Sequence, residues 1–512
     1  MLMLASALSL GSANAAVGDT FKIGGFTYTI TSETEPQVAV KATSQTSLSG
    51  DVEIPSTVTN NDVNYTVTSI APSGFLRVLD ITSVSFPKTL TSIGNYAFQH
   101  CSELTKVEIP STITEIGRGP FTNCASLTEI VVDTENQNFT SVNGILFSKS
   151  QKSLIQFPAG KDVTSYTIPA NVDSLNAYSF MDCHKLTSIT IPEGVKYIGD
   201  CAIYSCYGLS TISIPASVSE IYGAGAGGRC INLSEINVDD ANMNYCSVDG
   251  ILFNKQKNAI IIFPAGKNIE EYTVPETVDS IAPYGFSTCQ HLSAITIPAG
   301  VKSFATFTFF SCTNLKRFID LNPVPQMLRN TNVFNNVPTS MTLYVPKGSK
   351  EAYASATTWT RFTDIREIGA IMVSLNTRYV TLSIGETVEL KADIDKRDEV
   401  DVDSEKWESS NPEVATVSAD GVVTAVTDGT TTITVTVTDS NGDTYNDVCD
   451  ITVDSTSGIS IISADSKWSI DYSAPYNIYN LNGTSIGGRI ESLTPGLYII
   501  RQGTASAKIL VR

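Results

Sequence analysis

The sequence is dominated by a repeat of 23 residues, marked by prolines that close short apolar segments. This spacing separates successive prolines within three groups, namely Pro87 and Pro110, then Pro169, Pro192 and Pro215, then Pro275 and Pro298. A longer duplication is also visible, because NFTSVNGILFSKSQKSLIQFPAGK is followed further along by NYCSVDGILFNKQKNAIIIFPAGK. A unit this short cannot bury its own apolar face, so the units must stack and share a continuous core.

Three kinds of apolar residue hold a fixed register behind each proline. A cysteine follows by fourteen positions, or by fifteen in one unit, at Cys101, Cys124, Cys183, Cys206, Cys230, Cys289 and Cys312. A leucine lies three positions after each cysteine, and a phenylalanine follows most prolines by eleven, at Phe98, Phe121, Phe180, Phe286 and Phe309. Apolar residues two apart before the proline, such as Ile189 and Ile191, indicate a β-strand. We therefore predict a solenoid with a parallel sheet and internal apolar ladders.

The unit in IPEGVKYIGDCAIYSCYGLSTISIP resembles the BspA-like (treponemal type) leucine-rich repeats of bacterial surface proteins, over roughly residues 20 to 368. The segment LYVPKGSKEAYASATTWTRFTDIREI resembles the closing cap of that family. Two long gaps between prolines carry an insertion whose core, GILFSKSQKSLIQFP in the first, predicts a β-hairpin around Lys149 to Lys152.

The chain is expected to be mainly β and to fall into four segments. Residues 1–16 hold an apolar run ending at Ala13-Asn14-Ala15, which is typical of a signal peptide without a membrane anchor. The leucine-rich repeat solenoid is expected over 17–368, with 23-residue coils and hairpin insertions. An Ig-like β-sandwich is expected over 370–455, and a small C-terminal β-domain over 459–512.

The last two segments resemble known families. Residues 370–455 resemble a bacterial Ig-like domain of group 2, with Trp407, Val414, Val417, Gly421 and Val422 on the matching pattern. Residues 459–512 are similar to C-terminal sorting domains of type IX secretion, with Leu493, Pro495, Gly496, Tyr498 and Lys508 on that pattern. The second resemblance implies a sorting signal that is recognised at the outer membrane of a Gram-negative bacterium. A small β-domain without that role is the alternative.

Composition argues against several functions. The formal net charge of −19 disfavours nucleic acid and anionic membranes as partners. Only three histidines are present, His100, His184 and His291, and none is visibly paired with a nucleophile, so we expect no enzyme and no catalytic, metal or cofactor site. Gly223, Gly225 and Gly228 match G-x-G-x-x-G, but they fall in the turn of a coil, where a local irregularity or dent is the simpler interpretation.

Two further groups of residues leave alternatives open. The register cysteines are expected in the core as small apolar residues rather than in disulfides, while the redox state of Cys201, Cys246 and Cys449 stays open. The turn from Asp439 to Asp447 is expected to be an Asn-Gly hairpin, with weak calcium binding as the alternative.

The outward side chains between the buried ones offer a surface for binding. We predict ligand contacts along one small, mostly polar row, two residues before the closing proline or, for Asn237, at the equivalent position of a coil without that proline, at Glu108, Thr190, Ser213, Asn237 and Thr296. The family resemblance implies adhesion, so a secreted or surface-exposed, monomeric protein that binds host matrix proteins or other microbes is the leading hypothesis. A carbohydrate-binding module and a structural spacer without a ligand are the alternatives; exposed aromatic residues would favour the former, and the row has none.

Overall fold

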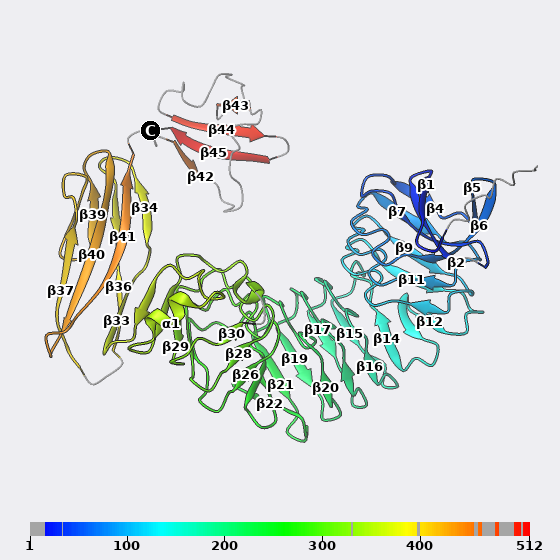
Figure 1. The fold of residues 1–512 in the computed structure, drawn as a ribbon, viewed down its shortest axis with the longest axis horizontal. Coiled ribbons are helices and arrows are strands. Elements are labelled where there is room, and N and C mark those ends of the chain that lie inside the picture. The colour runs from blue at the N-terminus through cyan, green and yellow to red at the C-terminus, as the bar shows by residue number, and fades with distance from the viewer. Residues whose placement is uncertain are drawn as a thin grey trace, which may run out of the picture. The chain divides into compact units, whose positions relative to one another are not determined.

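The computed structural model describes residues 16–32, 34–328, 331–396, 400–454, 459–462, 477–480, 496–502 and 505–511. The chain divides into two units, residues 1–367 and 368–512. The first is a stack of coils made almost entirely of strands and turns (Figure 1). Within the described residues, no helix is both long enough and apolar enough to cross a membrane.

Each coil of the first unit contributes one longer strand to a parallel sheet, and in most coils this strand lies just before a closing proline. This long-strand sheet is divided into four segments rather than running unbroken. The four segments are β4 (Gly50–Glu53), β7 (Ile81–Ser85), β9 (Lys106–Ile109) and β11 (Glu129–Val132); β15 (Ser165–Thr167) and β17 (Ser188–Thr190); β19 (Thr211–Ile214) and β21 (Glu235–Val238); and β25 (Glu271–Thr273), β27 (Ala294–Ile297), β29 (Arg317–Asp320), β31 (Thr342–Val345) and β32 (Ile365–Glu367). The single predicted sheet is therefore present, but interrupted.

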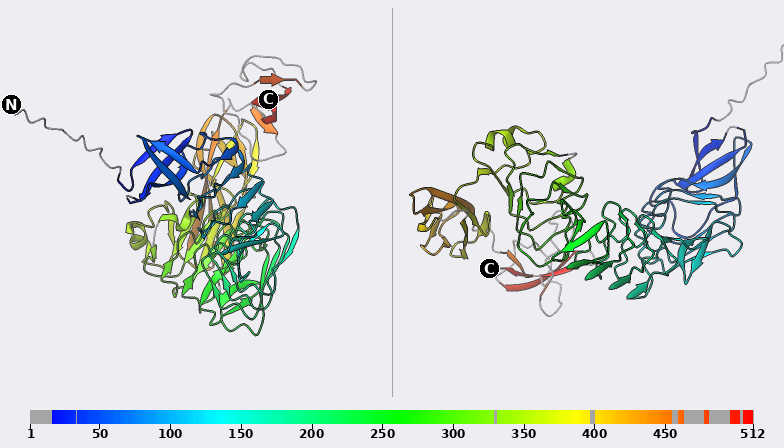
Figure 2. Two further views of the ribbon diagram at one scale, coloured as in Figure 1. Left: turned by 90° about the vertical axis from the view of Figure 1, so that its right-hand side faces the viewer. Right: turned by 90° about the horizontal axis from the view of Figure 1, so that it is seen from below.

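A second row of mostly two-residue strands, which the sequence did not predict, runs along another side of each coil. It forms three short-strand sheets, with β8 (Ser92–Ile93) and β10 (Glu115–Ile116) in the first; β14 (Ser153–Gln156), β16 (Ser174–Leu175), β18 (Tyr197–Ile198) and β20 (Glu220–Ile221) in the second; and β24 (Ala259–Ile262), β26 (Ser280–Ile281), β28 (Ser303–Phe304) and β30 (Met327–Leu328) in the third. Figure 2 shows the stacked coils from two further directions.

Antiparallel strands begin the solenoid and interrupt it twice. The N-terminal group is β1 (Thr20–Ile23), β2 (Phe26–Ser32), β3 (Gln37–Ala42), β5 (Thr57–Asn60) and β6 (Val63–Ile70). Its pairs are antiparallel except that β6 pairs in parallel with β3, and β6 also pairs in parallel with β8 of the short-strand row. The insertions are β12 (Phe139–Val142) with β13 (Ile145–Ser148), and β22 (Tyr245–Val248) with β23 (Ile251–Asn254). The predicted hairpin is confirmed, because β13 pairs antiparallel with β14, which then joins the parallel row through β16.

The core consists of the predicted ladders. The register cysteines and leucines are at most 1% exposed, and so are the five register phenylalanines. The phenylalanine rings stack from coil to coil; the centroids of Phe98 and Phe121 lie 5.6 Å apart, and those of Phe286 and Phe309 lie 5.5 Å apart. Phe75 and Phe334 extend these stacks at their ends, and the equivalent ring after each hairpin comes from the insertion itself, for example Phe157 against Phe180.

Left-handed backbone turns allow each coil to close within 23 residues. They fall at two fixed places, as at Tyr96 (φ 56°) and His100 (φ 62°) in one coil. Cys201 (φ 51°) takes the first of these places in its own coil, which explains why it lies outside the cysteine register. Non-glycine residues adopt this conformation at a cost, and here stacking against neighbouring coils on both sides imposes it.

The C-terminal end of the solenoid is closed by a short helix and a 3₁₀ turn. These are α1 (Lys350–Ser355) and η1 (Thr331–Phe334). Trp359 is fully buried there, and its indole N–H donates to the carbonyl oxygen of Gln326 at 3.0 Å. Such a cap covers the apolar end that the last coil would otherwise expose to water.

The second unit begins with an all-β region over residues 371–453. Its three sheets are β33 (Ile371–Leu375) with β36 (Ala392–Lys396); β34 (Tyr379–Leu382), β41 (Thr444–Val453), β40 (Gly429–Asp439) and β37 (Val402–Ser409); and β35 (Thr387–Glu389), β39 (Val422–Ala425) and β38 (Ala415–Val417). Alternate residues of β40, including Ile433, Val435 and Val437, are fully buried, as expected for a sandwich strand.

Four described strands lie in the C-terminal segment, β42 (Ile459–Ile462), β43 (Asn477–Tyr479), β44 (Gly496–Gln502) and β45 (Ala505–Val511). They form one antiparallel sheet in the order β42-β45-β44-β43. Leu493 and Pro495 of the sorting pattern lie outside the described residues, and so does the signal-peptide pattern through residue 15.

Candidate functional site

The outward face of the long-strand sheet is the surface that the sequence marked for binding. Glu108, Thr190, Ser213 and Asn237 are exposed, and the apolar residues between them point into the core. Because side chains alternate between the two faces of a strand, burying one set displays the other. The sheet interruptions separate these four residues into three groups, and of the predicted positions only Ser213 and Asn237 are partners in adjacent strands.

Glu108 borders a hollow of about 570 Å³ on the first segment of this face. Phe86 and Val131 provide half-buried apolar surface in it, with serines from β7 beside them. The ammonium of Lys106 lies 3.0 Å from the Glu108 carboxylate and 3.4 Å from that of Glu129. These exposed ion pairs contribute little stability, so the three charges remain available to a ligand.

Ser213 and Asn237 form an open polar pair on β19 and β21. Their Cα positions are register partners in the parallel ladder, and both side chains are exposed. Within the part of the chain that the structure describes, neither side chain has a hydrogen-bond partner. A hydroxyl and an amide together offer donors and acceptors to a ligand without a net charge.

Thr296 does not belong to this open surface, and the prediction that it does is wrong. Its side chain is 7% exposed, and every residue of β27 is buried. Large side chains replace small ones on the same face here: Ile319, the register neighbour of Thr296, is 2% exposed. Arg317 reaches across Ala294 on β27 to form an ion pair with Glu271 on β25.

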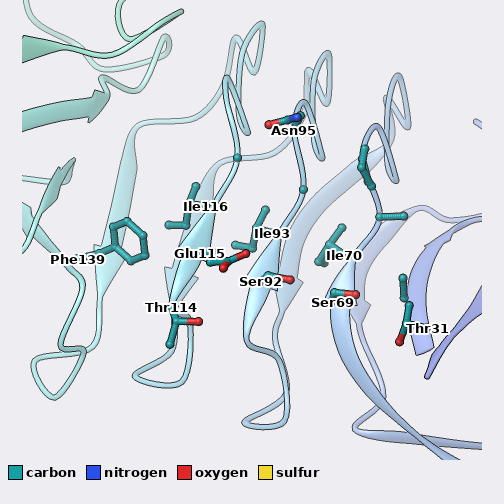
Figure 3. A pocket seen from close by; sticks show the side chains of 15 residues that line it. Thr31, Ser69, Ile70, Ser92, Ile93, Asn95, Thr114, Glu115, Ile116 and Phe139 are labelled. Atoms are coloured by element: carbon teal, nitrogen blue, oxygen red, sulfur yellow. The ribbon is translucent and has the colours of Figure 1, made fainter. Parts of the chain in front are cut away.

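A second hollow, of about 710 Å³, lies on the short-strand face (Figure 3). Ser69, Ser92 and Glu115 stand side by side on β6, β8 and β10, because the three strands pair in parallel register. Thr31 lies at one end of the hollow and Phe139 of β12 at the other. Sequence reasoning missed this site because it treated the short-strand segment of the repeat only as core.

The glycine-rich segment from Gly223 to Gly228 is tightly packed. A Cβ added at Gly225 would lie 2.5 Å from the carbonyl oxygen of Gly199, and one at Gly228 would lie 2.5 Å from the Cβ of Ala224. Ala226 pairs with Ile203 of the preceding coil through an isolated bridge. Close packing against the preceding coil at Gly225, and within the same coil at Gly228, is thus the reason for these glycines and leaves no room for a Cβ at either position.

The histidines are distributed over separate coils. His100 is a left-handed turn residue whose ring nitrogens lie 3.2 and 3.3 Å from the side-chain amide nitrogen of Asn123. His184 is exposed and stacks on Tyr207, with ring centroids 4.3 Å apart. Partial desolvation of the ring lowers the pKa of both imidazoles. His291 is exposed.

The acidic turn of the second unit is an Asn-Gly hairpin, as predicted. The Asp439 carboxylate accepts hydrogen bonds from the backbone N–H groups of Asn441 and Asp443, both at 2.9 Å, and from the Tyr445 hydroxyl at 3.0 Å. Gly442 has a φ of 87°, which suits glycine. The carboxylate is thus used inside the turn. Among the described residues, no group of three or more metal-ligating side chains is assembled.

The prediction that the register cysteines lie in the core is confirmed, and all ten thiols of the chain are free. Cys201 and Cys449 are buried as well, whereas Cys246 is half-buried in the second hairpin. Burial raises the pKa of the Cys183 thiol well above its ordinary value. A protonated, enclosed thiol is a poor nucleophile, which makes these residues structural.

Comparison with protein families agrees with the fold. The profile of the BspA type leucine rich repeat region matches residues 54–162, 156–264 and 260–365, and that of the bacterial Ig-like domain (group 2) matches residues 370–448. Comparison with the curated proteins gave no match.

Three solved structures are similar to parts of the chain. A leucine rich cell surface protein from Faecalibacterium prausnitzii A2-165 is 23% identical, with a TM-score of 0.35, and covers 69% of this chain and 95% of its own. A leucine-rich repeat protein from Eubacterium ventriosum is 20% identical, with a TM-score of 0.36, over 62% and 93%. One from Bacteroides ovatus is 20% identical, with a TM-score of 0.28, over 68% and 100%. Likeness at this level supports no statement about function.

The repeat match by itself spans more than half of the chain, from residue 54 to residue 365. It coincides with the stacked coils, whose cysteine, leucine and phenylalanine ladders follow the repeat unit. This protein belongs to the family of proteins with BspA type leucine-rich repeats.

Proposed function

We propose that this protein is an exported surface protein that binds another protein through the outward face of its long-strand sheets. The observation that carries the proposal is the contrast between the two sets of side chains on these strands. Ile212 and Ile236 are at most 2% exposed, whereas their neighbours Ser213 and Asn237 are exposed and have no partner among the described residues. A solenoid repeats this display from coil to coil and so offers an extended contact surface.

Host matrix proteins and proteins on other microbial cells are the proposed partners. The family resemblance supports this choice, and so does the acidic chain, since a net charge of −19 disfavours polyanions. The hollow beside Glu108 combines exposed charges with the half-buried ring of Phe86, a mixture suited to a protein side chain. A spacer role without a ligand is the competing proposal.

Export and sorting form part of the same proposal. The apolar N-terminal run ending at Ala13-Asn14-Ala15 would direct export, and the C-terminal segment would address the chain to the outer surface of a Gram-negative bacterium. The antiparallel sheet of β42 to β45 is compatible with a compact C-terminal sorting domain. Intact-mass measurement of the protein released from such a bacterium would reveal removal of either segment, and retention of both would contradict this part.

Binding of the full chain to immobilised matrix proteins and to whole microbial cells tests the proposal. The expected result is saturable binding to at least one protein surface that is lost after protease treatment of that surface. Absence of binding across the panel would favour the spacer.

A further inference from the structure

The short-strand hollow is lined by polar groups that the protein itself does not use. The Ser69 and Ser92 hydroxyls and the Glu115 carboxylate have no hydrogen-bond or ion-pair partner among the described residues. The threonines that alternate with them differ, since the Thr114 hydroxyl donates to the carbonyl oxygen of Thr91 at 3.3 Å. Figure 3 shows Ser69, Ser92 and Glu115 in a line across neighbouring strands.

The short strands before the second hairpin, β16, β18 and β20, provide an internal comparison with β6, β8 and β10 before the first hairpin. We call these two sets the second and the first copy, because the same positions recur in them with different side chains. Tyr197, 42% exposed, stands in the place of Ser92. Glu220 stands in the place of Glu115, and its carboxylate accepts a hydrogen bond from the Tyr222 hydroxyl. Gly117 occupies the position of Tyr222 in the first copy, so no such side chain reaches Glu115.

The third polar group, the hydroxyl of Ser69, also differs from its counterpart in the second copy. Ser174, the counterpart of Ser69, has its hydroxyl 2.7 Å from that of Ser153. The second copy therefore uses its polar groups internally and places a tyrosine where the first copy keeps open space. The first copy presents the same row to solvent, inside a hollow with walls at both ends.

The chemistry of the lining selects a class of ligand. Glu115 is the only charged residue among those described around the hollow, so an anionic ligand would meet repulsion without compensation. A carboxylate accepts hydrogen bonds and donates none, while serine hydroxyls do both, and a ligand rich in hydroxyl groups satisfies all three.

The wall at one end of the hollow is apolar. It is formed by the ring of Phe139 beside Ile116, both half-buried. An aromatic ring next to hydroxyl-binding groups suits the C–H face of a sugar ring. The backbone N–H of Phe139 donates to the side-chain oxygen of Asn136 at 2.8 Å, which holds this wall in place.

We infer that the short-strand hollow is a binding site for neutral oligosaccharides. Its volume of about 710 Å³ lies in the range of roughly 300 to 1,000 Å³ that is usual for small-ligand sites. The Glu115 carboxylate and the two serine hydroxyls bind sugar hydroxyl groups, and Phe139 contacts the apolar face of one ring. The site is separate from the proposed protein-binding surface, because it lies on the short-strand face.

The test is binding of the full chain to an array of neutral oligosaccharides of glucose, mannose and galactose, with sialylated and sulfated glycans alongside. Any neutral ligand found is then titrated by calorimetry against Glu115→Gln, which removes the charge at nearly constant shape, and Ser92→Tyr, which copies the second duplicate and fills the hollow. Each variant is expected to bind at least tenfold more weakly than the wild type. Circular dichroism confirms that each variant is folded.

Glu220→Gln is the matched control, because it makes the same change at the corresponding position of the second copy. It is expected to bind within twofold of the wild type. The inference is overturned if no neutral oligosaccharide binds, if only anionic glycans bind, or if Glu115→Gln and Ser92→Tyr bind as Glu220→Gln does.

Discussion

The thiol of Cys124 donates a hydrogen bond to the carbonyl oxygen of Phe98, 3.1 Å away in the preceding coil. The same contact joins Cys101 to Phe75, Cys206 to Phe180 and Cys312 to Phe286, at 2.9 to 3.2 Å. The carbonyl oxygen lies in the buried turn of each coil. Cysteine suits this position because it is small and apolar, yet its S–H can satisfy that oxygen.

Replacing Cys124 with alanine is expected to destabilise the solenoid by about 1–2 kcal/mol, since it removes the donor and leaves a small void. Cys246→Ala, at a half-buried thiol of the second hairpin, should cost less. Urea unfolding of the full chain, followed by circular dichroism, measures both changes. Equal losses of stability in Cys124→Ala and Cys246→Ala would show that burial of the thiol in the cysteine ladder has no special role.

The thiols also predict a pattern of chemical labelling. Burial raises the pKa of the Cys183 and Cys289 thiols well above their ordinary value, and Cys246 is the one cysteine that is not buried. A thiol reagent at pH 8 should therefore label Cys246 first in the native protein. All ten thiols should react after unfolding without a reductant, and a shortfall would reveal disulfides.

Asn136 anchors the first hairpin insertion to the coil before it. Its side-chain amide donates to the carbonyl oxygens of Pro110 and Ile113 at 2.9 and 3.0 Å, and its oxygen accepts from two backbone N–H groups. Asn242 makes the equivalent contacts in the second insertion. Because alanine would leave buried polar groups without partners, Asn136→Ala should cost about 2–4 kcal/mol.

The exposed Asn138 is the matched control for this change. Asn138→Ala should alter stability by less than about 0.5 kcal/mol. Thermal unfolding of both variants measures the difference. A similar small effect at both positions would mean that the hairpin is held by its apolar residues alone.

Asp320 predicts a pH dependence of stability. It is fully buried beside Gln326, and burial raises its pKa to about 6. The folded state therefore holds this proton more tightly than the unfolded state, so stability falls as the pH rises from about 4 to about 6. Asp320→Asn should remove this loss and stabilise the protein at pH 7.5 by up to about 3 kcal/mol, with little gain at pH 4.

Asp51 provides a control of opposite sign. Hydrogen bonds from the hydroxyls of Ser83 and Thr82 lower the pKa of its exposed carboxyl group. Asp51→Asn should therefore lose a little stability at pH 7.5 and most of that loss should persist at pH 4, because the lowered pKa keeps the folded-state carboxylate ionised there. Calorimetric melting at both pH values tests the pair, and a gain for Asp320→Asn at pH 4 as large as at pH 7.5 would contradict the account.

Much of the fold could be predicted because the repeat constrains it. The positions of Cys101, Leu104 and Phe98 follow from spacing alone, since a stacked coil must bury its recurrent apolar residues. The hairpin after β13 followed from the turn residues around Lys149 to Lys152. The short strands were missed because two residues carry too little alternation to distinguish a strand from a turn.

The binding surface was less predictable, because exposure depends on what lies across neighbouring strands. Thr296 and Thr190 have the same place in the repeat, yet only Thr296 lies beside large side chains such as Ile319. The short-strand hollow depends on Ser92 and on the hairpin residue Phe139, which meet only after the coils stack. Sequence spacing within one coil contains no information about such contacts.

The measurement that tests the central claim most directly is the affinity of the double variant Ser213→Arg with Asn237→Arg for a protein partner found with the full chain. Both changes place a large cation on the exposed pair of β19 and β21 without touching the core. Ser303→Arg, an exposed serine on the short-strand face, is the matched control. The account predicts at least tenfold weaker binding for the double variant and a change of less than twofold for the control. Equal affinity of all three proteins would contradict binding through the long-strand face.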